Sequence, residues 1–131
     1  MINLLIYGQT PSKKSSQQIV KVKNKLRIIP NPKYVKWEKY AVFQLKKQAE
    51  EIKLKTIDKP IHVKCKIYRR TKRQVDLINL LQSIHDVLTK AKIIKDDRLI
   101  ENIDGSRKVL GVDEGKERAE IFISVIGGKK N

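Results

Sequence analysis

Two stretches with apolar residues at helical spacing enclose a stretch that alternates, and this pattern constrains the fold more than any other feature. Apolar side chains recur every three or four residues from Tyr34 to Ile52, and again from Leu77 to Ala91. Between them, residues 61–67 alternate apolar and polar, which is typical of a strand with one buried face. The pattern predicts two amphipathic helices packed against a sheet.

The remaining elements are predicted from turn and capping chemistry. Asn31 followed by Pro32 is a helix start, because Asn can cap and Pro loses nothing at the first helical position. We expect that helix to run to about residue 54 and the second to begin near Asp76. Further strands are expected at residues 4–7, 98–104 and 119–125, with a hairpin at 19–22 and 26–29 and a basic turn at 105–108.

The order of these elements predicts an α/β (α+β) fold. It would be a single-domain sandwich of a mixed or antiparallel sheet with two main helices, over residues 1–126. Residues 127–131 form a polar C-terminal tail.

The charge of the chain indicates an anionic partner. Thirty Lys and Arg against 14 Asp and Glu leave a net charge of +16. Self-repulsion on this scale opposes compaction, so nucleic acid is the first candidate partner and an anionic membrane surface the second.

Several classes of protein are excluded at this point. No apolar run approaches the ~20 residues that span a bilayer, and the N-terminus lacks the pattern of a signal peptide. The single cysteine, Cys65, cannot form an internal disulfide and falls on the apolar face of its strand. We therefore expect a cytoplasmic protein without membrane association.

Carboxylates are few in so basic a chain, and several of them gather around the second helix. Four polar residues follow one another at offsets of three, four and three, along one line of the helix: Asp76, Asn79, Ser83 and Asp86. Asp96 and Asp97 come after a connection short enough to fold back on that helix. Clustered carboxylates repel one another and DNA, and Mg²⁺, which prefers oxygen ligands, removes both objections. Bound Mg²⁺ also polarises a phosphate and lowers the pKa of an attacking water.

A purely structural interpretation of the same residues stays open. Asp76 can cap the helix, Asp86 can be an exposed polar residue, and Asp96-Asp97 can form a turn. His85 is expected to be a partly buried structural residue rather than a general base.

The same stretch resembles the signature of the RusA-type Holliday junction resolvases. Residues 73–79 read Arg-Gln-Val-Asp-Leu-Ile-Asn, residues 86–88 read Asp-Val-Leu, and residues 93–97 read Ile-Ile-Lys-Asp-Asp. The opening Gly8-x-x-Pro11 with its following lysines, Tyr34 at the head of the first helix, and residues 103–108 are similar to the family as well. The resemblance covers nearly the whole chain.

The resemblance implies a homodimeric endonuclease of DNA recombination and repair that binds four-way junctions. With Mg²⁺, or with Mn²⁺ in its place, the dimer would make paired symmetrical cuts, one from each subunit. By position, Asp76 and Asp97 would bind the metal, with Asp96 beside them. Asp86 would complete the catalytic acids and Asn79 would support them.

Basic side chains flank these acids in the sequence, and we expect them to contact phosphates without reading the bases. They are Lys13, Lys14, Arg69, Arg70, Lys72, Arg73, Arg107 and Lys108. The alternative is that they only keep the chain soluble.

Two departures from the family pattern bear on activity. Ile78 stands where the family has a second aspartate, and Gln82 where it has a lysine. Either a variant site recruits Asp86 or Asn79, with Arg107 or Lys108 as the cation, or the chain binds junctions without cutting them, or position 78 has been altered deliberately.

A basic module unrelated to this family, such as a ribosome-associated RNA-binding protein, is the third hypothesis. It predicts that Asp76, Asp86 and Asp97 lie apart in space.

Overall fold

The computed structural model describes residues 1–126, so the predicted tail lies outside the described residues. The strands of the main sheet are β1 (Ile2–Tyr7), β4 (Ile61–Arg69), β5 (Ile100–Asn102), β6 (Arg107–Leu110) and β7 (Arg118–Val125). The other elements are the hairpin strands β2 (Gln17–Val22) and β3 (Lys25–Pro30), the helices α1 (Pro32–Glu51) and α2 (Leu77–Lys90), and the 3-10 helices η1 (Lys13–Ser15) and η2 (Asp97–Leu99).

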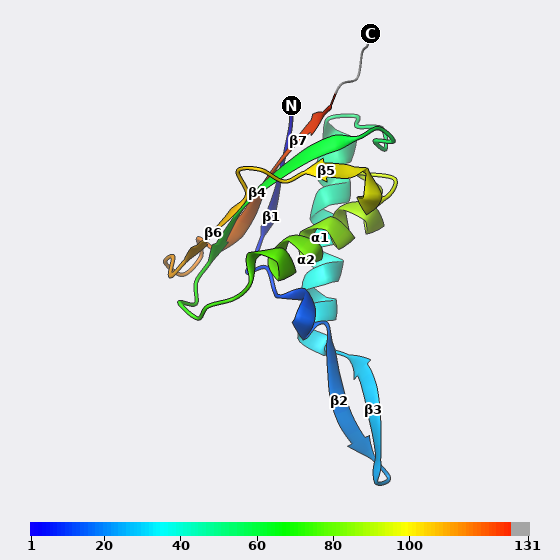
Figure 1. Cartoon of the computed structure of the whole chain (residues 1–131), viewed down its shortest axis with the longest axis vertical. Helices are drawn as coiled ribbons and strands as arrows, with labels where there is room; N and C mark the ends of the chain where they lie inside the picture. The colour runs from blue at the N-terminus through cyan, green and yellow to red at the C-terminus, as the bar shows by residue number, and fades with distance from the viewer. Residues whose placement is uncertain (127–131) are drawn as a thin grey trace.

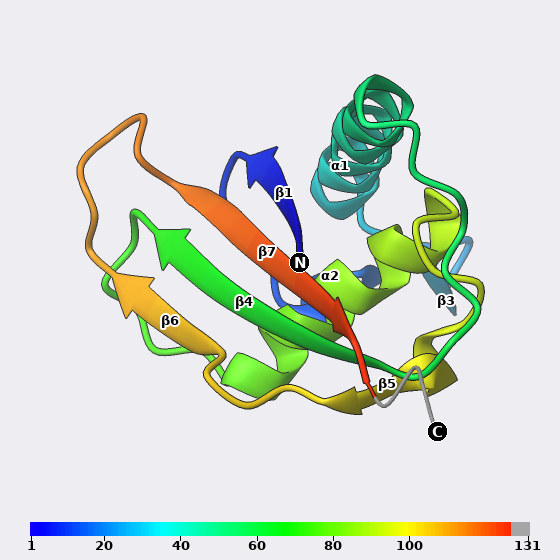
Figure 2. The ribbon, with the colours of Figure 1, turned by 90° about the horizontal axis from the view of Figure 1, so that it is seen from above.

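The main sheet is mixed, and both helices lie on the same face of it (Figure 1, Figure 2). Strand β7 lies between β1 and β4 and is antiparallel to both. The far edge of β4 pairs in parallel with β5 near its start and with β6 near its end. The predicted fold class, an α+β fold with a mixed sheet and two helices, is therefore confirmed.

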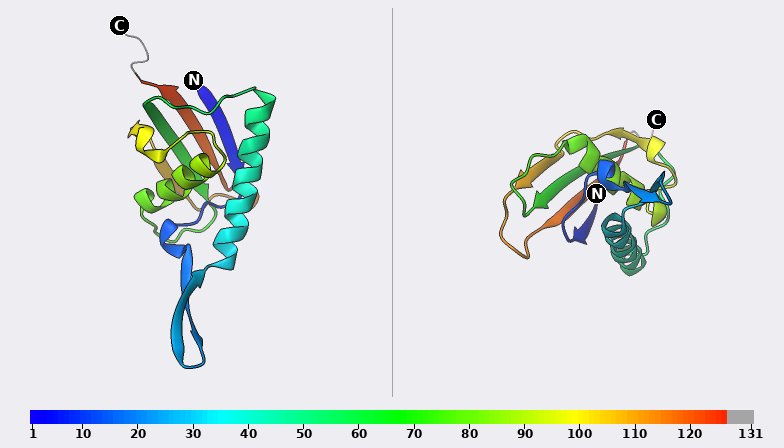
Figure 3. Two further views of the ribbon diagram at one scale, coloured as in Figure 1. Left: turned by 90° about the vertical axis from the view of Figure 1, so that its right-hand side faces the viewer. Right: turned by 90° about the horizontal axis from the view of Figure 1, so that it is seen from below.

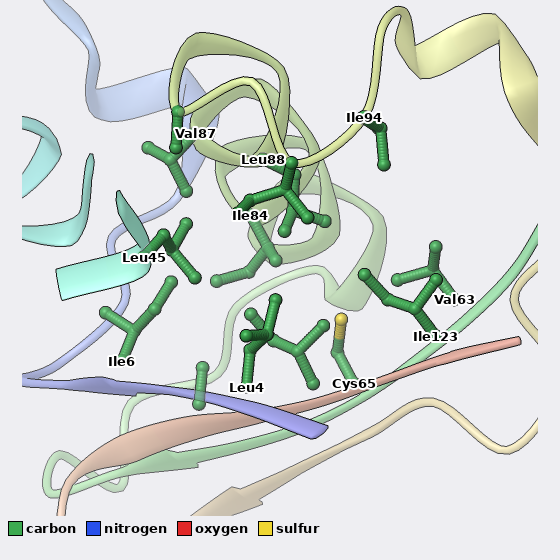
Figure 4. Packing of buried hydrophobic residues seen from close by; sticks show 14 of the residues in the cluster. Leu4, Ile6, Leu45, Val63, Cys65, Ile84, Val87, Leu88, Ile94 and Ile123 are labelled. Atoms are coloured by element: carbon green, nitrogen blue, oxygen red, sulfur yellow. The ribbon is translucent and has the colours of Figure 1, made fainter. Parts of the chain in front are cut away.

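The core lies between the sheet and the two helices (Figure 4). Alternate residues of β4 are fully buried, namely Ile61, Val63, Cys65 and Ile67. They face the apolar stripe of α2, which buries Leu81, Ile84 and Leu88 among others. The alternation and the helical stripe in the sequence thus mark the two surfaces that meet.

Helix α1 protects an edge of the sheet through two glutamine side chains. Gln48 accepts from the backbone N–H of Leu5 at 2.8 Å and donates to the Leu5 carbonyl at 2.7 Å. Gln44 makes the same pair with Tyr7, at 2.8 Å and 3.3 Å. The outer edge of β1 is paired here by side chains, as a neighbouring strand would pair it.

Two predictions for the region after α2 were wrong in detail. The expected strand at 98–104 is only β5, because Asp96 accepts from the backbone N–H of Arg98 and so holds η2 in a tight turn. The expected turn at 105–108 ends early, since Arg107 and Lys108 already belong to β6 and pair with β4. Among residues 1–126, no helix has the length and apolar character needed to cross a bilayer.

Candidate functional site

Several of the predicted site residues lie where η1 packs against α2. The segment from Thr10 to Ser16 runs across α2, and Pro11 is held there by the Ser83 hydroxyl, which donates to its carbonyl at 2.8 Å. The Tyr34 hydroxyl donates to the same Ser83 oxygen at 3.2 Å. Ser83 is therefore fully buried under η1, rather than displayed on the surface line that its spacing predicts.

Two hollows open on either side of this crossing. The first, which we name the Asp76 hollow, is lined by Ser12, Lys14, Gln74, Val75, Asp76, Asn79 and Lys108. The second, the Asp97 hollow, is lined by Lys13, Gln82, His85, Asp86 and Asp97. Consecutive lysines of η1 therefore line different hollows, and each hollow combines at least one carboxylate with at least one ammonium group.

In the Asp76 hollow, the acid is placed by the start of α2. Asp76 occupies the N-cap position, but its side chain makes no capping hydrogen bond. Its carboxylate instead accepts from the Asn79 amide at 3.3 Å, and the Lys14 Nζ lies 3.9 Å away. Lys108 Nζ donates to the Val75 carbonyl at 2.5 Å, next to Asp76. The capping interpretation of Asp76 is thus not supported, and its carboxylate is available at the surface.

In the Asp97 hollow, the ion pair of Asp86 with Lys13 is shorter than that of Asp76 with Lys14 in the other hollow. Lys13 Nζ lies 2.5 Å from the Asp86 carboxylate and 5.4 Å from the centre of the Tyr34 ring. Burial alone would lower the pKa of Lys13, but the hydrogen bond to Asp86 and the charges of neighbouring groups outweigh it and raise the pKa. Lys13 therefore remains an ammonium ion across the physiological range.

His85 lines the same hollow and is partly buried. Burial lowers the pKa of its imidazole, while the nearby Asp97 and Asp86 carboxylates oppose that shift. Its Nε2 is buried and finds no hydrogen-bond partner among the described residues. The ring is thus partly buried, as the sequence predicted.

Asp96 is paired mainly with its neighbour Arg98. Its carboxylate accepts from Arg98 Nη2 at 3.0 Å and Nε at 3.2 Å, as well as from the Arg98 backbone N–H at 2.8 Å. These hydrogen bonds with Arg98 lower the pKa of Asp96 to about 2. It lines a separate hollow with Asp58, Lys95 and Leu99. The three predicted metal ligands, Asp76, Asp96 and Asp97, thus line three different hollows, although the Asp97 side chain contributes to the lowered pKa of Asp96 and so lies near it.

The fit of a divalent cation follows from this placement. Within the part of the chain that the structure describes, no three His, Cys, Asp or Glu residues come together as a metal-binding group. Mg²⁺, however, commonly takes one or two carboxylates from the protein and completes its shell with water and substrate phosphate. Asp86 and Asp97 line one hollow, so they fit an open site of that kind, whereas a closed protein-only site does not fit.

The two departures noted in the sequence lie on the exposed side of α2. The Ile78 side chain is 56% exposed, and Gln82 is exposed at the rim of the Asp97 hollow. Neither packs into the core. Packing in the core therefore does not explain why position 78 is an isoleucine.

The predicted phosphate-binding residues surround the hollows unevenly. Arg69 and Arg73 line a further depression with Pro11, Ser12, Ser15, Gln74 and Val75. Arg69 is partly committed, because its Nε donates to the Thr10 carbonyl at 3.0 Å and burial lowers its pKa. Arg70 pairs with Glu114 at 2.9 Å. Lys72 and Arg107 are exposed and line neither the Asp76 nor the Asp97 hollow.

Sequence reasoning missed the residues that hold the crossing in place. The Gln9 side chain accepts from the backbone N–H groups of Arg70 and Thr71, at 2.8 Å and 3.3 Å. It thereby ties the loop before η1 to the loop before α2. Nothing local in the sequence distinguishes Gln9 from other loop glutamines, because its partners are 61 and 62 residues away.

Carboxylates and lysines thus share one surface of a small, strongly basic α+β fold. Comparisons with known proteins show which family the chain belongs to. Residues 9–124 match the family described as Endodeoxyribonuclease RusA. The chain is also 32% identical over 97 residues to the crossover junction endodeoxyribonuclease RusA of Aquifex aeolicus (strain VF5), covering 74% of this chain and 72% of that protein. The chain belongs to the RusA family of endodeoxyribonucleases.

Proposed function

We propose that this chain is a structure-specific endonuclease that binds four-way DNA junctions as a homodimer and cuts them in a Mg²⁺-dependent reaction, with Mn²⁺ as a substitute. The observation that supports it most is the Asp97 hollow, where Asp86 and Asp97 line one depression together with Lys13. The A. aeolicus relative carries a crossover junction activity in its name. A two-fold enzyme also suits the pairing of cuts on a two-fold substrate.

The lysines of η1 supply the first part of the mechanism. A phosphate entering either hollow meets an ammonium group, Lys13 in one and Lys14 in the other. Contacts of this kind hold the DNA backbone without reading its sequence. Lys108 lines the Asp76 hollow, and we assign it the positive charge that Gln82 cannot provide.

The acids supply the second part. In this proposal Asp97 and Asp86 hold the divalent ion, and Asp76 with Asn79 supports from the neighbouring hollow. When bound, the ion would polarise the scissile phosphate and lower the pKa of the attacking water. Lys13, which pairs with Asp86, would contact the entering phosphate, while the divalent ion would take its place at the Asp86 carboxylate.

A second function is favoured by a specific observation. Ile78 is exposed and offers no metal ligand, and residues 1–126 contain no group of three His, Cys, Asp or Glu residues arranged to hold a metal ion. A chain that binds branched DNA without cutting it would have this surface. The family match disfavours the unrelated RNA-binding alternative, and of the three acids it expected to lie apart, Asp86 and Asp97 line one hollow while Asp76 lines another.

Cleavage of an end-labelled four-way junction by matched variants tests the assignment. Asp97→Asn and Asp86→Asn should each reduce cleavage by at least 100-fold while leaving junction binding within about threefold. Asp113→Asn, in an exposed loop away from the hollows, is the control and should cut like the parent chain. Equal loss in all three variants, or no loss in the first two, would refute the assignment.

The non-cutting alternative makes a different prediction in the same assay. The parent chain would then bind the junction tightly and leave it intact, and Ile78→Asp would introduce cleavage. Binding should weaken steeply with salt in both cases, with a log–log slope near −0.9 per phosphate contact. A binding constant insensitive to salt would overturn the nucleic-acid proposal as a whole.

A further inference from the structure

The β2–β3 hairpin projects away from the sheet and the helices (Figure 1, Figure 3). Its strands pair with each other and form a two-stranded sheet of their own. At the base, the Asn31 N–H donates to the Ser16 carbonyl at 2.8 Å and joins the hairpin to the start of α1. An isolated two-stranded hairpin is only marginally stable in water. An arm of this kind indicates a binding partner rather than a packing role.

Positive charge is concentrated at the end of the arm. Lys21, Lys23, Lys25 and Arg27 all lie near the tip, and the first acidic residue of the chain is Glu38. The turn consists of Lys23 and Asn24, both with positive φ, at 51° and 65°. This is the geometry of a tight two-residue hairpin loop, and it places a lysine at the extreme end of the molecule.

One face of the arm carries three exposed aliphatic side chains, with Lys21 beside them opposite Leu26. Ile19 lies directly opposite Ile28, and Leu26 lies two residues further along on the same face. Their side chains are 68%, 66% and 75% exposed, respectively. Exposed aliphatic side chains do not increase the solubility of a protein, so they indicate a contact with a partner.

We propose that this hairpin is the element that recognises the branch point of the junction. Its cations contact phosphates where the DNA arms converge, and its Ile19, Leu26 and Ile28 face packs against base-pair surfaces that are exposed there. This inference rests on the proposed function, because it takes branched DNA as the ligand.

Charge and shape favour DNA over a second copy of the chain as the occupant. A second copy that docked its own hairpin here would bring Lys21, Lys23, Lys25 and Arg27 against the same four cations, and the two sets would repel each other. DNA complements the cations, and apolar wedges from proteins are known to enter between base steps. Six residues per strand give an arm about 20 Å long, more than twice the ~8.5 Å depth of the major groove.

The test compares binding of a four-way junction and of a linear duplex in EDTA, with the double variant Leu26→Ser/Ile28→Ser. Both substitutions keep the charge of the arm. We expect junction affinity to fall at least tenfold and duplex affinity to stay within twofold. Ile52→Ser, at an apolar residue that is 53% exposed beyond α1, is the control and should change neither.

Crosslinking from position 26 makes the test independent of how well the variant hairpin folds. A photoreactive phenylalanine analogue in place of Leu26 should crosslink to nucleotides within the branch point and not to the ends of the arms. Crosslinks to a second protein chain, or a change of oligomeric state in the double variant, would show that the apolar face is an interface between copies. Equal loss of junction and duplex affinity would also overturn the proposal. A parent chain without preference for junctions would instead refute the proposed function.

Discussion

The glutamine pair on α1 allows a stability prediction that follows directly from the geometry. Gln44 and Gln48 each make two hydrogen bonds to the edge of β1, at 2.7–3.3 Å. A typical intramolecular hydrogen bond contributes about 0.5–1.5 kcal/mol net. Replacing either side chain by Met keeps its size and helix propensity but removes both bonds. Each variant should therefore lose about 1–3 kcal/mol of unfolding free energy.

Urea denaturation followed by circular dichroism measures this loss. The midpoint should fall while the m-value stays constant, because the surface exposed on unfolding is unchanged. The melting temperature should fall by roughly 3–10 °C for a domain of this size. Gln82→Met is the matched control, since Gln82 is an exposed glutamine of α2, and it should stay within about 0.5 kcal/mol of the parent. If Gln44→Met and Gln48→Met also stay within that range, the side chains do not hold the edge strand and the reasoning is wrong.

Three further predictions concern buried or paired groups. Burial raises the pKa of the Cys65 thiol to about 12, so Cys65 should resist thiol reagents in the folded protein and react once urea unfolds the chain. If Cys65 of the folded protein reacts as fast as an exposed thiol, the prediction is wrong. Arg98 lowers the pKa of Asp96 from 3.8 to about 2, so the ion pair stabilises the fold fully above pH 4 and this stabilisation is lost as the pH falls towards 2. In Arg98→Met, an NMR titration of the Asp96 carboxyl should show its pKa return towards 3.8. An unchanged titration would exclude the pairing. Ser83→Ala removes the partner of the Tyr34 hydroxyl and of the Pro11 carbonyl, so thermal unfolding should show a loss of about 1–3 kcal/mol, whereas a neutral effect would show that the crossing is held elsewhere.

Local patterns predicted the fold well because most elements are determined by short-range periodicity and capping. The alternation of residues 61–67 became β4, and the Asn31-Pro32 start became the N-terminus of α1, with the Asn31 side chain accepting from the Lys33 N–H at 3.0 Å. Strand β6 was missed because it exists through its pairing with β4, some 40 residues earlier. Four residues with no alternation of their own carry no local signal of such a pairing.

The candidate site was predicted in part, for a related reason. Helical spacing placed Asp76, Asn79, Ser83 and Asp86 on one side of α2, and three of them do line the hollows. Ser83 does not, because Tyr34 and Pro11, which are 49 and 72 residues away in the sequence, cover it and hydrogen-bond to its hydroxyl. Adjacent aspartates in the sequence do not reveal that Asp96 pairs with Arg98. The backbone of η2 directs the two aspartate side chains into different hollows.

The most direct test of the account is the cleavage of a synthetic four-way junction by the unaltered chain. Each strand would be end-labelled in turn, with Mg²⁺ or Mn²⁺ present, and a linear duplex of the same sequence would serve as control. The account predicts paired nicks at symmetrical positions on opposite strands, in the junction alone and only with metal. An intact junction under conditions where the chain is fully bound to it would contradict the proposed cleavage, and would leave a junction-binding protein whose catalytic acids are incomplete at Ile78.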